Sequence, residues 1–295
     1  MAQGTGTEGF LSREARTGLT LIAPPGLYAL LLLAMPIATI VIYSFLTDGY
    51  LEIIRDFTLD NYIKAWTDPL YRLIMAKSLG VSIGVTFITV VLAYPVAYYV
   101  SFFADPSRKS LWLFLITIPF WTSYLIRIFL WKVILGYNGV INSGLMSLGL
   151  INEPITAINY NMGAVVTALA HAYAPFAILP IFVALEKIDR SLLEAGQDLG
   201  ESAFSTFLRV TLPLSMPGVV GAVMIVFIPT IGDFVTPQLL GGPEGRLIAN
   251  VIQLQYLKLD NYPLGSAVAV SAMLIVGAVA MLFLFLNRRY LRGPK

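Results

Sequence analysis

The sequence contains no cysteine and a single histidine among its 295 residues. Without cysteine the chain can form no disulfide, no Cys-ligated zinc site and no thiol nucleophile, and the lone His171 rules out a multi-histidine metal site. Charge is also scarce, because only 12% of the residues are Asp, Glu, Lys or Arg, about half the share in soluble domains. A net charge of +2 without a Lys/Arg-rich run argues against nucleic acid as a partner.

Long apolar stretches are what the chain has instead. Hydrophobic residues make up 57% of it and the mean hydropathy is +0.78, which leaves too little polar surface for a water-soluble globule. Six runs have about the 20 residues that cross a bilayer as a helix. The sequence therefore predicts an all-α, polytopic membrane protein with six transmembrane helices, at residues 20–46, 78–103, 110–135, 162–184, 218–235 and 264–286.

The N-terminus and the basic residues indicate an orientation. Residues 1–18 are polar, and the apolar stretch after them is too long for a cleavable signal, so we interpret it as a retained first span. Eleven of the nineteen Lys and Arg residues fall in segments that are inside if the N-terminus is inside, against six in the outer connections. We therefore expect both termini in the cytoplasm, and a docking partner at the long outer connections 47–77, 136–161 and 236–263.

The connection between the fourth and fifth spans carries the most specific signals. Ser191-x-x-Glu194 is typical of a capping box that begins a helix, and Gly200 stands where a helix would end on a left-handed residue. The two signals bracket a helix of about nine residues. We expect Ser202 to cap a second short helix, which Leu212-Pro213 would end before the fifth span begins.

The two short helices would lie on the cytoplasmic face with acidic and apolar side chains mixed. The first carries Glu194 and Asp198 but no basic residue after Arg190, whereas helices that rest on lipid favour Lys and Arg. A protein partner therefore explains this surface better than the lipid interface does. The residues expected to contact that partner are Ser191, Leu192, Glu194, Ala195, Gly196, Asp198, Leu199 and Gly200.

The spacing in this loop resembles the EAA signature of bacterial ABC import permeases. Glu194-Ala195-Gly196, then Gly200, nine further residues and Val210-x-Leu212-Pro213 match it, with glycine and valine where alanine and isoleucine are usual. The resemblance implies a type I ABC importer permease fold, with the first short helix as a coupling helix seated in a cleft of an ATPase. ATP and Mg would be used by that partner ATPase, whereas this chain would be non-catalytic and would bind no cofactor or metal.

Other segments resemble the spermidine/putrescine branch of this family, B-type subunit. They include 234–243, 119–127, 21–25 and 261–267. The resemblance implies a polyamine or related small organic solute as cargo across the bacterial inner membrane. Implied partners are an ABC ATPase dimer, a second permease (a C-type homologue or a copy of this chain), a periplasmic solute-binding protein and membrane lipid. The expected division is a cytoplasmic tail 1–18, a first helix 19–47, a core domain 74–287 containing the coupling loop 186–217, and a cytoplasmic tail 288–295.

Motifs for catalysis are missing. The sequence has no G-x-x-x-x-G-K-[ST], no H-E-x-x-H and no G-x-S-x-G. One rival function is a membrane-embedded hydrolase that uses His171, although a lone histidine in an apolar helix is more often a helix–helix hydrogen bonder. The other rival is an ion-coupled secondary transporter, which predicts carboxylates near the membrane midplane, where the sequence offers none.

Two ionisable residues fall within the predicted spans. Counted along straight helices from their inner ends, Arg127 and Asp233 both lie about 25 Å from the inner face. We favour a salt bridge between them, since intramembrane ions usually find partners. The alternative makes Asp233 the counter-charge for a cationic cargo, with Trp121, Tyr124 and Tyr173 as cation–π walls.

Overall fold

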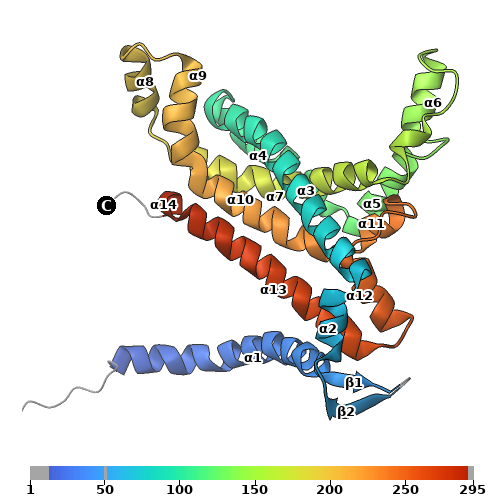
Figure 1. Cartoon of the computed structure of the whole chain (residues 1–295). Helices are drawn as coiled ribbons and strands as arrows, with labels where there is room; N and C mark the ends of the chain where they lie inside the picture. Colours follow the sequence, from blue (N-terminus) through green and yellow to red (C-terminus); the bar gives the residue numbers. More distant parts are fainter. Residues whose placement is uncertain (1–12, 50–51, 292–295) are drawn as a thin grey trace, which may run out of the picture.

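The computed structural model describes residues 13–49 and 52–291, which are mostly helical (Figure 1). Two short strands, β1 (Leu46–Asp48) and β2 (Ile53–Phe57), pair antiparallel. The α-helices are α1 (Arg13–Tyr43), α2 (Asp60–Thr67), α3 (Pro69–Phe102), α4 (Lys109–Thr117), α5 (Tyr124–Ile134), α6 (Val140–Ser147), α7 (Met162–Glu186), α8 (Arg190–Asp198), α9 (Ala203–Thr206), α10 (Leu212–Gly232), α11 (Val235–Leu240), α12 (Ile248–Leu257), α13 (Tyr262–Leu286) and α14 (Arg288–Leu291).

Five helices are long and apolar enough to cross a membrane, and a bent pair makes a sixth span. The prediction of an all-α chain with six spans is confirmed, with the β hairpin as the one addition in the described residues. Several boundaries differ. Helix α1 starts at Arg13, inside the predicted tail, and ends at Tyr43, so that Leu46 belongs to β1. Helix α3 starts at Pro69, directly after its N-cap residue Asp68. Residues 1–12 of the predicted N-terminal tail and 292–295 of the C-terminal one lie outside the described residues.

The third span is broken near Pro119. Its two parts, Pro106–Trp121 and Tyr124–Ile134, meet at 89°. Pro119 lies in the 3₁₀ turn η2 (Ile118–Trp121) and has no N–H for the helical ladder, and Thr122 and Ser123 are extended. The span predicted at 110–135 is therefore present but bent, and the depth of Arg127 counted along a straight helix is wrong.

The fifth span begins earlier than predicted. Helix α9 continues into α10 through a π-helical turn, η4 (Phe207–Thr211), so that Ala203–Gly232 forms one span of 30 residues. The prediction that Leu212-Pro213 ends the second short helix is wrong. The N–H of Leu212 bonds to the carbonyl of Phe207, five residues back, and this shifted pattern accommodates Pro213, which has no N–H.

Helices α3, α7 and α10 form the main core. They pack along their lengths around fully buried side chains such as Val85 and Ile181. Gly218 sets the approach of α10 to α7, because a Cβ there would lie 2.5 Å from the Cβ of Ala184 and 2.5 Å from the carbonyl oxygen of Pro180. Helix α13 packs with α12 and α2 around a second apolar cluster.

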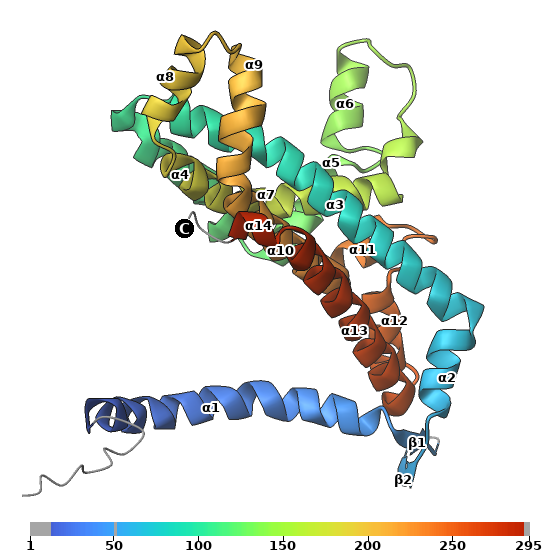
Figure 2. The same cartoon turned by 60° about the vertical axis from the view of Figure 1, so that its left-hand side comes forward.

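Helix α1 stands away from this bundle in both views (Figures 1 and 2). It contacts α13, yet none of the apolar window within Thr20–Tyr43 is buried. At one end of the long helices lie α8, α9 and α14, and at the other lie α2, α12 and the β hairpin (Figures 1 and 2). The loop singled out by sequence is thus at the opposite end from two of the three predicted outer connections.

Candidate functional site

Helix α8 has the predicted length but a different cap. It spans nine residues, Arg190–Asp198, and its N-cap is Asp189, whose carboxylate accepts the N–H of Ser191 at 3.0 Å. The predicted capping box at Ser191 and Glu194 is therefore wrong, because the chain turns helical two residues earlier. The hydrogen bond from Ser191 holds the pKa of Asp189 below its usual range.

The C-terminus of α8 is a Schellman motif, as Gly200 predicted. Gly200 has φ +81°, a left-handed conformation that favours glycine. Its N–H bonds to the carbonyl of Gln197 at 2.9 Å, and that of Glu201 bonds to the carbonyl of Gly196 at 3.1 Å. Ser202 then caps α9 by accepting the N–H of Ser205 at 3.2 Å, which confirms the second predicted cap.

The outer surface of this α8–α9 element is apolar and acidic. No residue of α8 is buried, and the side chains of Leu192, Leu199 and Phe204 are 47%, 85% and 70% exposed. Of the predicted contact residues, Ser191, Leu192, Glu194, Ala195, Asp198, Leu199 and Gly200 are exposed, and Gly196 is half-buried. A Cβ on Gly196 would lie 3.2 Å from the side chain of Thr206, so this small residue lets α8 pack on α9.

Glu201 is an acid of the loop that bonds to other residues of the same loop. The carboxylate of Glu201 accepts from the hydroxyl of Ser205 and pairs with Arg209. The Ser205 hydroxyl first, and the Arg209 charge next, hold the pKa of Glu201 below its usual range. Glu194 and Asp198 are the acids that remain on the exposed surface.

The start of η4, directly after the α8–α9 element, is fixed to α3 by aromatic packing. Phe207 packs edge-on against Tyr94 and Tyr98 of α3, at centroid distances of 5.6 and 5.8 Å. Tyr94 also shares a hydrogen bond of 2.8 Å with the hydroxyl of Ser215 in α10. The structure thus turns Phe207 toward α3 and away from the outer surface.

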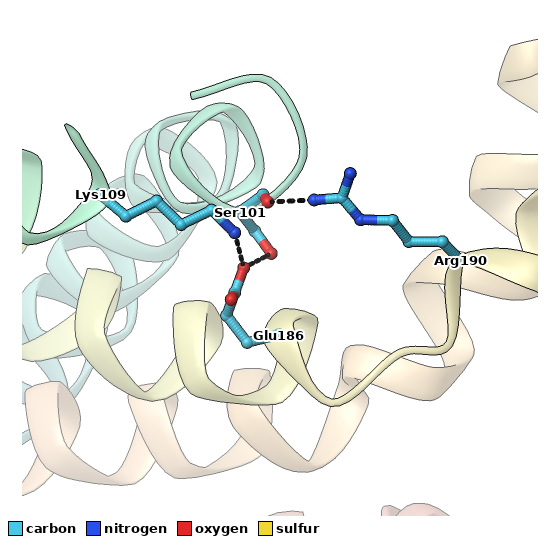
Figure 3. Close-up of polar contacts among 4 residues, drawn as sticks. All are labelled: Ser101, Lys109, Glu186 and Arg190. Carbon is cyan, nitrogen blue, oxygen red and sulfur yellow. Dashed lines mark hydrogen bonds and ion pairs between the residues drawn. The ribbon is translucent and has the colours of Figure 1, made fainter. Parts of the chain in front are cut away.

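A polar cluster fixes the start of α8 to the rest of the bundle (Figure 3). A carboxylate oxygen of Glu186, the last residue of α7, accepts from Lys109 Nζ at 2.6 Å and from the Ser101 hydroxyl at 2.7 Å. Arg190 Nη2 donates to the carbonyl of Ser101 at 3.3 Å. Sequence reasoning missed this cluster because its members are far apart in the chain.

Asp233 closes the break between α10 and α11. Its Oδ1 accepts the N–H groups of Val235 and Thr236 at 2.9 and 3.3 Å. Its Oδ2 accepts the Thr236 hydroxyl at 2.6 Å and the hydroxyl of Tyr124 from α5. Asp233 is 8% exposed, so the carboxylate is buried and fully hydrogen-bonded within the chain. The pattern Asp233-x-x-Thr236 after an apolar run was a readable helix-cap signal.

The terminal nitrogens of Arg127 donate to backbone carbonyls and not to Asp233, and its buried Nε has no hydrogen-bond partner in the described residues. Its guanidinium donates to the carbonyl of Thr122 at 3.2 Å, beside the break in the third span, and to that of Ala172 in α7 at 3.4 Å. In the described part of the chain no ion pair joins Arg127 to Asp233, so the salt bridge we favoured is wrong. Each side chain bonds backbone groups at a nearby helix break, and Arg127 also bonds to a carbonyl of α7.

The three aromatic residues considered as cation–π walls lie in two different places. Tyr124 contacts Asp233 directly, and Tyr173 packs on the same core cluster as Tyr124. Trp121 is 72% exposed and packs edge-on against Phe114 of α4 at 5.2 Å. His171 accepts the indole N–H of Trp131 through Nδ1 at 3.2 Å, which confirms its expected role as a hydrogen bonder between helices.

Comparisons with known proteins agree with the resemblance seen in the sequence. The family model described as binding-protein-dependent transport system inner membrane component matches residues 61–292. Spermidine/putrescine transport system permease protein PotB of Escherichia coli K12 is 36% identical over 257 residues, 87% of this chain and 92% of that protein. Its namesake in Haemophilus influenzae is 37% identical over 255 residues, 86% of this chain and 88% of that protein.

A solved structure supports the fold. The crystal structure of a bacterial ABC transporter involved in the import of the acidic polysaccharide alginate matches with a TM-score of 0.73, covering 94% of this chain and 96% of that one at 16% identity. The predicted type I ABC importer permease fold is therefore confirmed, with the loop at 190–211 at one end of its helices. The chain belongs to the family of inner-membrane components of binding-protein-dependent transport systems.

Proposed function

We propose that this permease carries polyamines, spermidine or putrescine, into the cell and that α8 is its contact with a partner ATPase. The observation that carries the ATPase contact is the α8–α9 element. Its helices are capped, its outer side chains are exposed, and Phe207 directly after it packs on α3. The polyamine cargo is supported by the two relatives, which share at least 36% of their residues with this chain over most of their lengths.

The contact surface consists of exposed leucines and acids. A nucleotide-binding subunit would receive Leu192 and Leu199 in an apolar cleft, with basic groups placed for Glu194 and Asp198. ATP and Mg would be bound and used by that partner, an ATPase dimer. This chain then acts as a non-catalytic subunit that converts the movement of α8 into rearrangement of the membrane helices.

Two further partners follow from the architecture. A second permease, either a C-type homologue or a copy of this chain, would present the second coupling surface that an ATPase dimer requires, and the unburied α1 offers apolar surface to it. A periplasmic solute-binding protein would dock at the end of the bundle that carries α2, α12 and the β hairpin. This arrangement places α8, α14 and both termini in the cytoplasm, in agreement with the distribution of Lys and Arg.

In this proposal the residues considered for the cargo pathway act mainly by holding the surrounding helices in place. Asp233 and Tyr124 hold α5, α10 and α11 together, Arg127 holds the bend of the third span, and Tyr173 lies on the same core. Trp121 is exposed enough to meet cargo or a neighbouring subunit. A buried, fully hydrogen-bonded Asp233 makes a poor free counter-charge, so we assign cargo contact to surfaces that these residues shape.

The test is reconstitution of the complex in liposomes. Spermidine-loaded binding protein should stimulate ATP hydrolysis and drive spermidine uptake. Leu199→Glu on the exposed end of α8 should abolish co-purification of the ATPase, because a buried unpaired charge in an apolar contact is costly. The matched variant Leu257→Glu changes a leucine of α12 at the other end that is 71% exposed, against 85% for Leu199, and it should retain the ATPase.

Two results would count against the proposal. If no ATPase co-purifies with the unmodified chain, the assignment of α8 fails. If loaded binding protein stimulates hydrolysis only with another solute, the polyamine cargo fails while the transport mechanism stands.

A further inference from the structure

Four polar residues tie together four elements at the end of the bundle where α8 lies (Figure 3). Ser101 lies in the last turn of α3, Lys109 begins α4, Glu186 ends α7 and Arg190 begins α8. Glu186 accepts from Lys109 and Ser101, and Arg190 donates to the Ser101 carbonyl. Ser101 is 1% exposed and the Lys109 side chain is 17% exposed, whereas Glu186 and Arg190 lie at the surface, so the cluster extends from the buried end of α3 to the solvent.

The charges in this cluster oppose the dipoles of their own helices. A carboxylate is unfavourable at a helix C-terminus, yet Glu186 ends α7; a cation is unfavourable at a helix N-terminus, yet Lys109 and Arg190 begin α4 and α8. None of the three charges stabilises its own helix. Their contribution therefore lies in the contacts that they make between helices.

The cluster also supplies links that the chain path lacks. Helix α8 is joined through the backbone to α7 on one side and to α9 and α10 on the other, whereas α3 and α4 have no covalent connection to it. Helix α4 has no fully buried residue, and only its partly buried Leu113 and Ile116 pack against the main core. Its ion pair to Glu186 is the one salt bridge that attaches it to α7 in the described residues.

We propose that Lys109, Ser101, Glu186 and Arg190 form a latch that transmits the movement of α8 to α3 and α4. When an ATPase moves α8, the hydrogen bond from Arg190 to Ser101 pulls on the end of α3. The backbone connection from α8 to α7 moves Glu186 at the same time, and the ion pair between Glu186 and Lys109 pulls on the start of α4. The third span, whose bend follows α4, is thereby made to move with the coupling helix. This proposal rests on the assignment of α8 as the ATPase contact.

The experiment uses the complete complex in liposomes, with spermidine-loaded binding protein, and measures spermidine taken up per ATP hydrolysed. Glu186→Gln retains an acceptor for Ser101 but removes the ion pair, and Lys109→Met removes the pair from the other side. Each should lower the ratio about fivefold, the lower end of coupling between sites, with hydrolysis maintained. Lys187→Met is the matched control, because Lys187 is an exposed neighbour without an ion pair to the described residues.

The exchange variant Lys109→Glu/Glu186→Lys provides a rescue. It restores the ion pair with each charge at its favourable helix end, so it should recover most of the ratio, even if one single variant assembles poorly. A wild-type ratio in Glu186→Gln, or an equal loss in Lys187→Met, would overturn the latch. Failure of the unmodified complex to respond to loaded binding protein would instead refute the proposed function.

Discussion

The hydrogen bonds around Asp233 allow the two interpretations of this residue to be separated by measurement. If Asp233 serves to hold α5, α10 and α11 together (the clip interpretation), its replacement should destabilise the protein. If it is a counter-charge for cargo, its replacement should abolish transport and leave stability unchanged. The carboxylate is 8% exposed and accepts four hydrogen bonds, two from backbone N–H groups and two from hydroxyls. The clip interpretation therefore predicts a definite order of effects.

The magnitudes follow from which groups lose a partner. In Asp233→Asn the amide oxygen still accepts both N–H groups, while the two hydroxyls lose a charged acceptor, a loss of about 1 kcal/mol each and about 2 kcal/mol together. Asp233→Ala also leaves two buried N–H groups unpaired, so it should cost about 4 kcal/mol. Tyr124→Phe removes one charge-assisted bond and should cost about 2 kcal/mol.

The assay is a double-mutant cycle on thermal or denaturant unfolding of the purified complex, paired with uptake. Asp233→Asn and Tyr124→Phe should be coupled by about 1 kcal/mol, because each removes part of the same bond. Tyr137→Phe is the control, since it removes the hydroxyl of a tyrosine that is 56% exposed. Additive effects in the cycle, or loss of uptake by Asp233→Asn with unchanged unfolding, would refute the clip and restore the cargo interpretation.

Two further predictions concern packing and pH. Gly218→Ala should lower the free energy of unfolding by about 2 kcal/mol, because the new Cβ would lie 2.5 Å from atoms of Ala184 and Pro180. Denaturant unfolding of the complex measures this change. An unchanged free energy of unfolding would show that α10 can move away from α7 without cost. The pKa of Asp189 is lowered by its bond to Ser191, so its stabilisation of α8 is present above the unfolded pKa and is lost as pH falls through the lower folded value. Hydrogen exchange of α8, corrected for intrinsic rates, should be constant from neutral pH to about pH 5 and increase below about pH 4, whereas Asp189→Asn, also a good cap, should remove this pH dependence.

Sequence patterns predicted the features that depend on neighbours in the chain. Gly200 and Ser202 marked a helix end and a helix start correctly, because a left-handed residue and an N-cap act over a few residues. The capping box at Ser191 was wrong because Asp189 offered an equally good cap two residues earlier. Short-range rules locate such caps but cannot choose between neighbouring candidates.

The helix breaks were less predictable. Proline in a membrane span can be tolerated in a continuous helix, as Pro213 is through a π-helical turn, or can end one, as Pro119 does in the third span. Which outcome occurs depends on partners far away in sequence, such as Phe207 packing between tyrosines of α3. The Glu186 cluster joins residues up to 89 positions apart, and for that reason no local pattern indicates it.

The two intramembrane charges are best understood together with those breaks. Where the third span bends, the carbonyl of Thr122 is left without a helical donor, and Arg127 supplies one. Where α10 stops at Gly232, the first N–H groups of α11 need acceptors, and Asp233 supplies them. A backbone group left unpaired in a membrane costs several kcal/mol, which is sufficient reason to keep an ionisable side chain beside each break. Equal depth along idealised helices made the residues look like partners, although each serves its own break. For the polyamine cargo proposed above, the clip interpretation assigns selectivity to exposed surfaces of the pathway and not to the buried carboxylate of Asp233.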